Sequence, residues 1–276
     1  MALEVKMPGA EMAAPVYGNR HRLGKVVLVG AGPGDPELLT VRAVQRIREA
    51  DVLVYDRLVE PGVLALARES AEKIFMGKLQ GHHARQDEIH ELLVEKAREG
   101  KLVIRLKGGD PFLFGRGGEE VEFLAEHGIL FEVVPGVSSC LSAPLSAGIA
   151  VTHREASSSV AIVTGHNADG HEDRVDWTAV ARMGTAVFLM GVHNVETIAV
   201  KLIAAGRSPE TPAAMIQMAF CEGERVVTGT LKNIGAEVRR AGIEPPATLV
   251  VGEVVRLREK LQQLIAMHLT ESEVEA

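Results

Sequence analysis

The sequence predicts an α/β protein built from two α/β domains with a ligand cleft between them. Short runs rich in β-branched residues alternate with helical patterns in the first half of the chain, which favours a mostly parallel sheet covered on both faces. After about residue 158 the pattern starts again with more strands and fewer helices. The 276 residues suit one large or two ordinary domains, and 46% hydrophobic residues can fill their cores.

Five strands are expected in the first half, at 25–30, 51–56, 72–77, 101–108 and 130–136. The segment 84–100 predicts a helix with Gly100 at its C-terminal cap. Four apolar residues of that helix share one face: Ile89, Leu92, Leu93 and Ala97. The segment 117–128 repeats this pattern, so strands and helices alternate.

The second half predicts strands at 159–166, 185–191, 213–220, 225–231 and 247–255. A helix is expected between Asn194 as N-cap and Gly206 as C-cap residue. The run 225–231 suits a hairpin partner, so this sheet is expected to be mixed or antiparallel. Four parts follow: a loose N-terminal extension (1–23), two α/β domains (24–137 and 138–258) and a C-terminal amphipathic helix or tail (259–276).

The composition argues against several classes of protein. The net charge of −7 argues weakly against a nucleic-acid or membrane-surface binder. Two cysteines, Cys140 and Cys221, form neither a disulfide framework nor a metal motif, which suits a reducing, cytoplasmic compartment. No apolar run reaches membrane-spanning length, and residues 1–22 lack the apolar core of a signal peptide.

The stretch "VLVGAGPGDPE" (27–37) resembles a dinucleotide-binding loop but departs from it in two ways. Its glycines are spaced G-x-G-x-G, whereas the dinucleotide fingerprint is G-x-G-x-x-G. Asp35 and Pro36 suit the N-cap and first position of a helix, so a carboxylate would repel a pyrophosphate there. A nicotinamide site, a tight turn without a ligand, and a different ligand close to the backbone all stay open.

A second glycine-rich run, "RLKGGDPFLFGRGGEEVEFL" (105–124), follows the strand expected at 101–108. Ligands of open α/β sheets bind where strands end, and glycines leave backbone groups accessible to them. The alternative is a solvent-facing turn in which Asp110 and Glu119 cap helices.

Five motifs in this order carry a resemblance to a known family: "VGAGPGDPELLT", "VYDRLV", "RLKGGDPFLFGRGGEE", "VPGVSS" and "AGIAVTHR". Over about residues 24 to 257 the chain resembles uroporphyrinogen-III C-methyltransferases. That family implies the tetrapyrrole methyltransferase (class III methyltransferase) fold, with S-adenosyl-L-methionine between two α/β domains and S-adenosyl-L-homocysteine as product. The dehydrogenase and chelatase region of fused siroheme synthases has no counterpart here, so a stand-alone enzyme is expected.

The resemblance implies a cofactor site without phosphate-binding groups. Its expected residues are Pro33, Gly108, Gly109, Asp110, Leu113, Ser138, Ser139, Met190, Ala219, Ala247 and Thr248. Asp110 would accept hydrogen bonds from a hydroxyl or the ammonium of the cofactor.

The implied substrate is uroporphyrinogen III, whose eight carboxylates require positive charge in the site. Arg116 and Arg154 are the expected clamps, because a guanidinium binds a carboxylate through two parallel hydrogen bonds. The alternative is surface ion pairing of Arg116 with Glu119 or Glu120 and of Arg154 with Glu155. Glu119 and Asp56 are candidate proton acceptors or orienting groups.

The implied reaction is methylation at C2 and C7, which gives precorrin-2 by way of precorrin-1, and the family implies a homodimer. Three rivals stay open: an NAD-dependent oxidoreductase, a non-catalytic tetrapyrrole-binding protein, and a methyltransferase of the same fold with another substrate. His82, His83 and His90 lack the spacing of a closed metal site, so no metal is expected.

Overall fold

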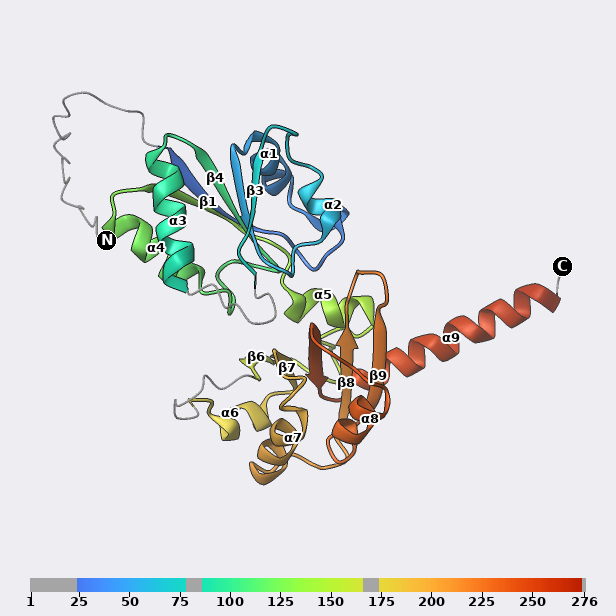
Figure 1. Cartoon of the computed structure of the whole chain (residues 1–276). Coiled ribbons are helices and arrows are strands. Elements are labelled where there is room, and N and C mark those ends of the chain that lie inside the picture. The colour runs from blue at the N-terminus through green and yellow to red at the C-terminus, as the bar shows by residue number, and fades with distance from the viewer. Residues whose placement is uncertain (1–23, 78–85, 166–173, 275–276) are drawn as a thin grey trace, which may run out of the picture.

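The computed structural model describes residues 24–77, 86–165 and 174–274, and it contains two five-stranded sheets joined by α5 (Ser139–Ser146), which lies between them (Figure 1). The predicted N-terminal extension, His82 and His83 fall outside these residues. Within the described part of the chain, no helix combines the length and apolar character needed to cross a membrane.

The first sheet is entirely parallel, as predicted, with strand order β3-β2-β4-β1-β5. Its strands are β1 (Lys25–Gly30), β2 (Val52–Tyr55), β3 (Glu72–Phe75), β4 (Leu102–Lys107) and β5 (Leu130–Val134). All five carboxyl ends therefore meet at one edge of the sheet. This edge is where ligands bind in open α/β sheets.

Helices cover both faces of the first sheet because its central strands are apolar on both sides. One face packs around Ile47 and Val63, from α1 (Val41–Glu49) and α2 (Pro61–Leu64). The other packs around Leu93 and Leu124, from α3 (Gln86–Arg98) and α4 (Gly117–Glu126). The predicted apolar face of α3 is confirmed, since Ile89, Leu93 and Ala97 are buried.

The second sheet is mixed, with strand order β6-β7-β10-β8-β9. Its strands are β6 (Val160–Thr164), β7 (Thr185–Leu189), β8 (Pro212–Gln217), β9 (Arg225–Thr230) and β10 (Ala247–Val251). The predicted hairpin is confirmed, because β8 and β9 pair antiparallel. Since β10 is antiparallel to both β7 and β8, the start of β10 lies beside the ends of those two strands.

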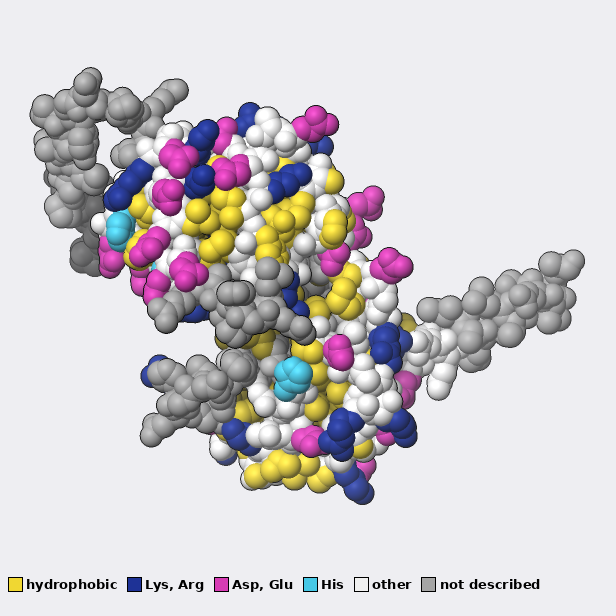
Figure 2. Space-filling view, in the orientation of Figure 1, with side chains coloured by type: hydrophobic (Ala, Val, Ile, Leu, Met, Phe, Trp, Pro, Cys, Tyr) yellow, Lys and Arg dark blue, Asp and Glu magenta, His cyan; other side chains and the backbone are white. Residues whose placement is uncertain are grey.

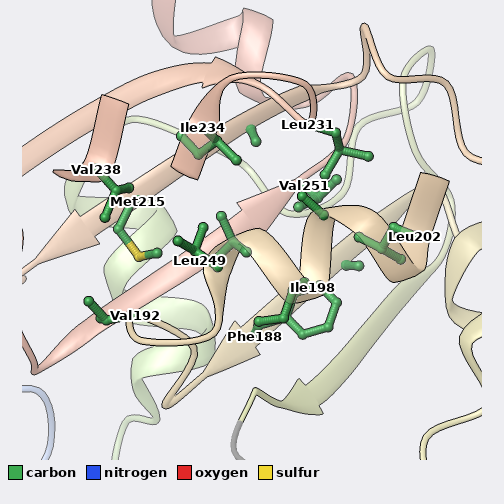
Figure 3. Packing of buried hydrophobic residues seen from close by; sticks show 14 of the residues in the cluster. Phe188, Val192, Ile198, Leu202, Met215, Leu231, Ile234, Val238, Leu249 and Val251 are labelled. Atoms are coloured by element: carbon green, nitrogen blue, oxygen red, sulfur yellow. The ribbon is translucent and has the colours of Figure 1, made fainter. Parts of the chain in front are cut away.

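One face of the second sheet is covered by α6 (Trp177–Arg182), α7 (Val195–Ala204) and α8 (Ile234–Arg240). Phe188, Met215 and Leu249 project from the strands into this core, opposite Ile198, Leu202 and Ile234 (Figure 3). The other face packs against α5 and the segment that leads into α9 (Val255–Val274), through Ala143 and Val254. Beyond its first turns α9 points away from the rest of the protein (Figure 1).

The expected N-cap of α7 differs from the structure in one respect. Asn194 occupies the N-cap position, but its side chain makes no capping hydrogen bond. Its amide instead donates to the carbonyl of Gly165, 2.7 Å away, at the end of β6. The side chain thus ties α7 to the neighbouring strand rather than to its own first turn.

Candidate active site

Four glycines bring three loops together at the carboxyl edge of the first sheet: Gly30, Gly32, Gly109 and Gly136. We call this set the glycine junction. Gly32 and Gly109 form an isolated antiparallel bridge, with the Gly109 amide 2.7 Å from the Gly32 carbonyl. A Cβ on Gly136 would lie 2.2 Å from the Gly109 carbonyl oxygen, and one on Gly30 would lie 2.4 Å from the Gly136 nitrogen. Gly30 and Gly136 are therefore required for the close approach of backbone to backbone, whereas Gly32 and Gly109 supply a left-handed backbone (φ 69° and 66°).

The first loop does not form a phosphate seat. As predicted, Asp35 is the N-cap of a short 3₁₀ helix, η1 (Pro36–Leu38), with Pro36 in its first turn. The Asp35 carboxylate accepts the Glu37 amide at 2.8 Å, so an acidic group takes an N–H that an anion would need. The Pro33 carbonyl instead accepts from the Cys221 thiol, 3.5 Å away, which joins this loop to the second sheet's turn 218–221.

The second loop is organised by Asp110. One carboxylate oxygen accepts the Phe112 amide at 2.9 Å, and the other accepts the Gly136 amide at 3.2 Å. Asp110 thus fixes its own turn and holds the loop after β5, although further lone pairs on both oxygens can accept from a ligand. Leu113 turns inward and packs on the core beneath α5.

The N-terminus of α5 faces this loop. Ser138 is its N-cap and accepts from the Cys140 amide at 3.4 Å. A Cβ built on Gly109 would lie 3.7 Å from the Ser138 Cα and 3.9 Å from the Ser139 hydroxyl oxygen. Gly108 lies against the loop that follows β2, since a Cβ added to Gly108 would lie 2.9 Å from the Leu58 Cβ. The structure therefore brings the expected residues of these loops, which are distant in sequence, together at the carboxyl edge of the first sheet.

The remaining expected cofactor residues lie along the edge of the second sheet that contains the ends of β7 and β8. Met190 directly follows β7, has a left-handed backbone (φ 57°) and is 51% exposed. Ala219 lies in the turn after β8, between Met218 (φ 51°) and Phe220 (φ 60°). Ala247 and Thr248 begin β10, and Thr248 pairs in register with Leu189. Non-glycine residues with a left-handed backbone, here Met190, Met218 and Phe220, are concentrated at functional sites.

The expected substrate clamp Arg116 is paired with Glu119. Its guanidinium Nε lies 3.0 Å from Glu119 Oε1, and both side chains are about half exposed. This hydrogen bond raises the pKa of Arg116 and lowers that of Glu119. Arg116 also has a left-handed backbone (φ 57°) as the N-cap of α4. The structure thus shows Arg116 in the ion pair that the alternative predicted.

Arg154 behaves differently from Arg116. It is exposed in the turn between His153 and Ser157, which form a bridge, and it has no ion pair with any residue that the structure describes. The alternative pairing with Glu155 is therefore not what the structure shows. The guanidinium is available to an anionic ligand.

The candidate proton acceptor Asp56 follows β2 at the same edge. One carboxylate oxygen accepts the Leu58 amide at 3.0 Å, and the other lies 3.6 Å from the guanidinium of Arg105. The side chain is 26% exposed. Because Leu58 abuts Gly108, the loop that carries Asp56 borders the glycine junction.

Two groups of residues were not anticipated as parts of the site. Phe112 and Phe114 are 58% and 41% exposed in the loop that precedes Arg116, and Phe114 has a left-handed backbone (φ 53°). Arg105, Lys107 and Glu120 form a buried charge cluster behind Asp56. The signal for the cluster was present as two cations two positions apart in a strand, which places both on one face.

Figure 2 shows hydrophobic side chains exposed where the two halves of the molecule meet.

No three His, Cys, Asp or Glu side chains among the described residues are grouped as metal ligands would be. His90, one of the three histidines considered for a metal, is buried between Gln86 and Phe123. Burial lowers the pKa of His90.

Comparisons with known proteins agree with this architecture. The family model of tetrapyrrole (corrin/porphyrin) methylases matches residues 25–235. Siroheme synthases from Pseudomonas putida (strain W619) and Chromobacterium violaceum are 51% and 50% identical over 240 and 246 residues. These matches cover 86% and 88% of this chain but 52% of each relative. The chain thus spans about half the length of these curated relatives.

Two solved structures are similar over most of both chains. One is uroporphyrin-III C-methyl transferase from Thermus thermophilus complexed with S-adenyl homocysteine, at 46% identity and a TM-score of 0.73. It is matched over 85% of this chain and 100% of that one. The other is a cobalamin biosynthetic enzyme, cobalt precorrin-4 methyltransferase, at 28% identity, a TM-score of 0.75, and coverage of 84% and 95%.

The two α/β units, one with a parallel sheet and one with a mixed sheet, form a two-domain architecture that this chain shares with these solved methyltransferases. Within the methyltransferases of this architecture, this chain belongs to the tetrapyrrole (corrin/porphyrin) methylase family.

Proposed function

We propose that this protein transfers methyl groups from S-adenosyl-L-methionine to C2 and C7 of uroporphyrinogen III, giving precorrin-2 by way of precorrin-1. The observation that carries the proposal is the joining of the two glycine loops. They meet through the Gly32–Gly109 bridge, and the Pro33–Cys221 contact links them to the second sheet. The Thermus thermophilus structure at 46% identity supports the same activity.

The residues proposed for the cofactor fit its chemistry. S-adenosyl-L-methionine has an adenine, a ribose and an amino-acid end but no phosphate, and it supplies an electrophilic methyl group when bound. The expected cofactor residues, as a group, offer backbone groups, hydroxyls and the Asp110 carboxylate. None of these expected residues is a lysine or an arginine. A nicotinamide dinucleotide would instead need free N–H groups or cations around its pyrophosphate. The Asp35 carboxylate would repel that pyrophosphate, and it already accepts the Glu37 amide.

The substrate is proposed to bind beside α4, where charge and apolar surface adjoin. Arg116 exchanges Glu119 for a substrate carboxylate, and Arg154 holds another. Exposed Phe112 and Phe114 give the flat pyrrole rings an apolar wall in the same loop as Arg116. This arrangement answers how a chain of net charge −7 binds a polyanion.

Methylation of a pyrrole carbon requires positioning and the loss of one proton. The carbon–carbon bond forms as the carbon–sulfur bond breaks, with its electron pair left on sulfur, and the ring then releases a proton. The loops fix the two reactants relative to each other, which is the main contribution expected of the protein. Asp56, oriented by Leu58 and Arg105, is proposed to accept the proton, and Glu119 is the alternative acceptor.

An anaerobic assay with uroporphyrinogen III tests this proposal. Wild-type protein is expected to produce the chromophore of oxidised precorrin-2. Arg116→Ala is expected to lower kcat/KM for uroporphyrinogen III by roughly 10- to 100-fold, the value of one or two charge-assisted hydrogen bonds. Affinity for S-adenosyl-L-homocysteine should stay within about twofold.

Arg182→Ala is the matched control, since Arg182 is exposed at the end of α6. Full activity of Arg116→Ala would contradict the clamp. Binding of NAD without binding of S-adenosyl-L-homocysteine would contradict the whole proposal. Binding of uroporphyrinogen III without turnover would leave a tetrapyrrole-binding protein, and turnover of a different precorrin would change the substrate alone.

We further propose that the protein is a cytoplasmic homodimer. Leu141 and Leu145 on α5 are 51% and 67% exposed, which is an unusual amount of apolar surface for one short helix. Light scattering on the purified protein measures the mass directly. A monomer at micromolar concentration would refute this part of the proposal.

A further inference from the structure

A buried charge cluster lies behind the candidate site, between β4 and α4. Arg105 and Lys107 project from the same face of β4, and Glu120 on α4 is completely buried between them. Lys107 Nζ lies 2.8 Å from Glu120 Oε1, and Arg105 Nε lies 3.3 Å from the same oxygen. The Gln86 amide is a third donor to this oxygen, at 3.3 Å.

Arg105 connects this cluster to the site. Its Nη2 faces Asp56 Oδ2 at 3.6 Å while its Nε faces Glu120, so one guanidinium lies between two carboxylates. Arg105 Nη1 also donates to the Leu106 carbonyl at 3.0 Å. The guanidinium therefore faces Asp56, Glu120 and the Leu106 carbonyl at once, while the other Asp56 oxygen accepts the Leu58 amide at 3.0 Å.

Stability alone is a poor reason for this arrangement. Taking charges out of water costs several kcal/mol per ion, and buried ion pairs repay that cost only with full hydrogen bonding. Here Glu120 Oε2 has no hydrogen-bond partner among the described residues. Burial also lowers the pKa of Lys107, so its charged form is disfavoured where it lies. A cluster with these costs is better explained by what it holds.

Asp56 belongs to the cluster because its carboxylate balances the remaining positive charge of the buried members. Arg105 and Lys107 carry two positive charges, and Glu120 supplies one negative charge. The second negative charge comes from Asp56, which is the member of the cluster that reaches solvent, at 26% exposure against 0% for Glu120. The buried members thus position a carboxylate at the edge where substrate is proposed to bind.

We propose that Glu120 and Arg105 are positioning residues for Asp56: Glu120 holds Arg105, and Arg105 holds the Asp56 carboxylate toward the substrate. This inference rests on the proposed function, because Asp56 must act in the reaction for its position to matter. Glu120 and Arg105 are buried, at 0% and 4% exposure, so they are assigned no contact with a reactant. Their effect on the reaction passes through Asp56.

A double-mutant cycle tests the inference. Single-turnover methylation of uroporphyrinogen III is measured for wild type, Glu120→Gln, Asp56→Asn and the double variant, together with KM for S-adenosyl-L-methionine. Glu120→Gln is expected to slow the chemical step on the order of 10-fold, as displaced catalytic groups do, with KM for the cofactor within about twofold. In the Asp56→Asn background, Glu120→Gln should change the rate by less than about twofold, as expected for coupled residues.

Glu122→Gln is the control, because Glu122 is exposed on the same helix. Equal losses from Glu120→Gln in both backgrounds would overturn the positioning role and leave the proposed function standing. A wild type that binds S-adenosyl-L-homocysteine without methylating uroporphyrinogen III would overturn both. Should Glu120→Gln fail to fold by circular dichroism, Arg105→Lys, which keeps the buried charge but shortens its reach, gives the same cycle with the same expected dependence on Asp56.

Discussion

Replacing Gly136 by alanine is expected to separate the loops of the glycine junction. The added Cβ would lie 2.2 Å from the Gly109 carbonyl oxygen and 2.7 Å from the Gly30 Cα. Ordinary contacts are about 3.5 Å, so backbone must move by about 1 Å. No flexible side chain is available to yield, since both contacts are backbone. Overpacking of this kind costs roughly 1–3 kcal/mol.

The assay combines urea unfolding with calorimetric titration of S-adenosyl-L-homocysteine. Gly136→Ala should lower the free energy of unfolding by about 2 kcal/mol and weaken ligand binding by about 10-fold or more, because a movement of about 1 Å disrupts a preorganised site. Gly118→Ala is the control, since a Cβ there meets nothing within 4 Å in α4. It should be neutral or stabilising by up to about 1 kcal/mol. Wild-type stability and affinity in Gly136→Ala would refute the close-packing argument.

Three further predictions concern single side chains. The pKa of Glu132 is held below its ordinary value of 4.5, first by its hydrogen bond from Lys25; the stability it gives is present above pH 4.5 and is lost as pH falls through the lower folded pKa. Acid titration of unfolding should therefore show a smaller loss below pH 4.5 in Glu132→Gln than in wild type, and identical slopes would argue against it. Burial raises the pKa of Cys221 to about 11 from 9.0, so at pH 8 iodoacetamide should alkylate it roughly 100-fold more slowly than in urea-unfolded protein; mass spectrometry of the Cys221 peptide measures this, and equal rates would contradict it. Asp110→Asn should weaken S-adenosyl-L-homocysteine binding and cost about 1–3 kcal/mol of stability, because an amide cannot accept from both the Phe112 and Gly136 N–H groups as the carboxylate does; unfolding and titration check this, and an unchanged variant would show that the two loops hold without it.

The first sheet was readable from sequence because its signal is strong and local. Buried parallel strands read as continuous apolar runs, and "KVVLVG" and "KLVIRLKG" each contain one. The order β3-β2-β4-β1-β5 was not readable, since it depends on which apolar faces meet after the chain has turned back. In the second half, the hairpin of β8 and β9 was foreseen, whereas the short helices α6 and α8 were not.

The two glycine loops of the candidate site could be found from sequence, but their relation could not. Nothing local to Gly32 indicates that it will bridge Gly109, since the pair lies far apart in the sequence and is joined only by the fold. The pairing of Arg116 with Glu119 is local and was foreseen as an alternative. The link from Asp56 through Arg105 to Glu120 was missed, because it joins three separate elements.

The sheet order also determines when strands can pair while the chain is being synthesised. Within the first sheet β1 is made before the other strands, yet it lies between β4 and β5, the last two strands of that sheet, so its pairing on both edges is complete only after residue 134. Every strand of the second sheet follows that point, and the N-terminal unit of a chain generally folds first as it emerges. The Pro33–Cys221 contact spans 188 residues and forms only once most of the second unit exists. Ligand binding is thus the last property the nascent chain acquires, and it reports that both units have folded.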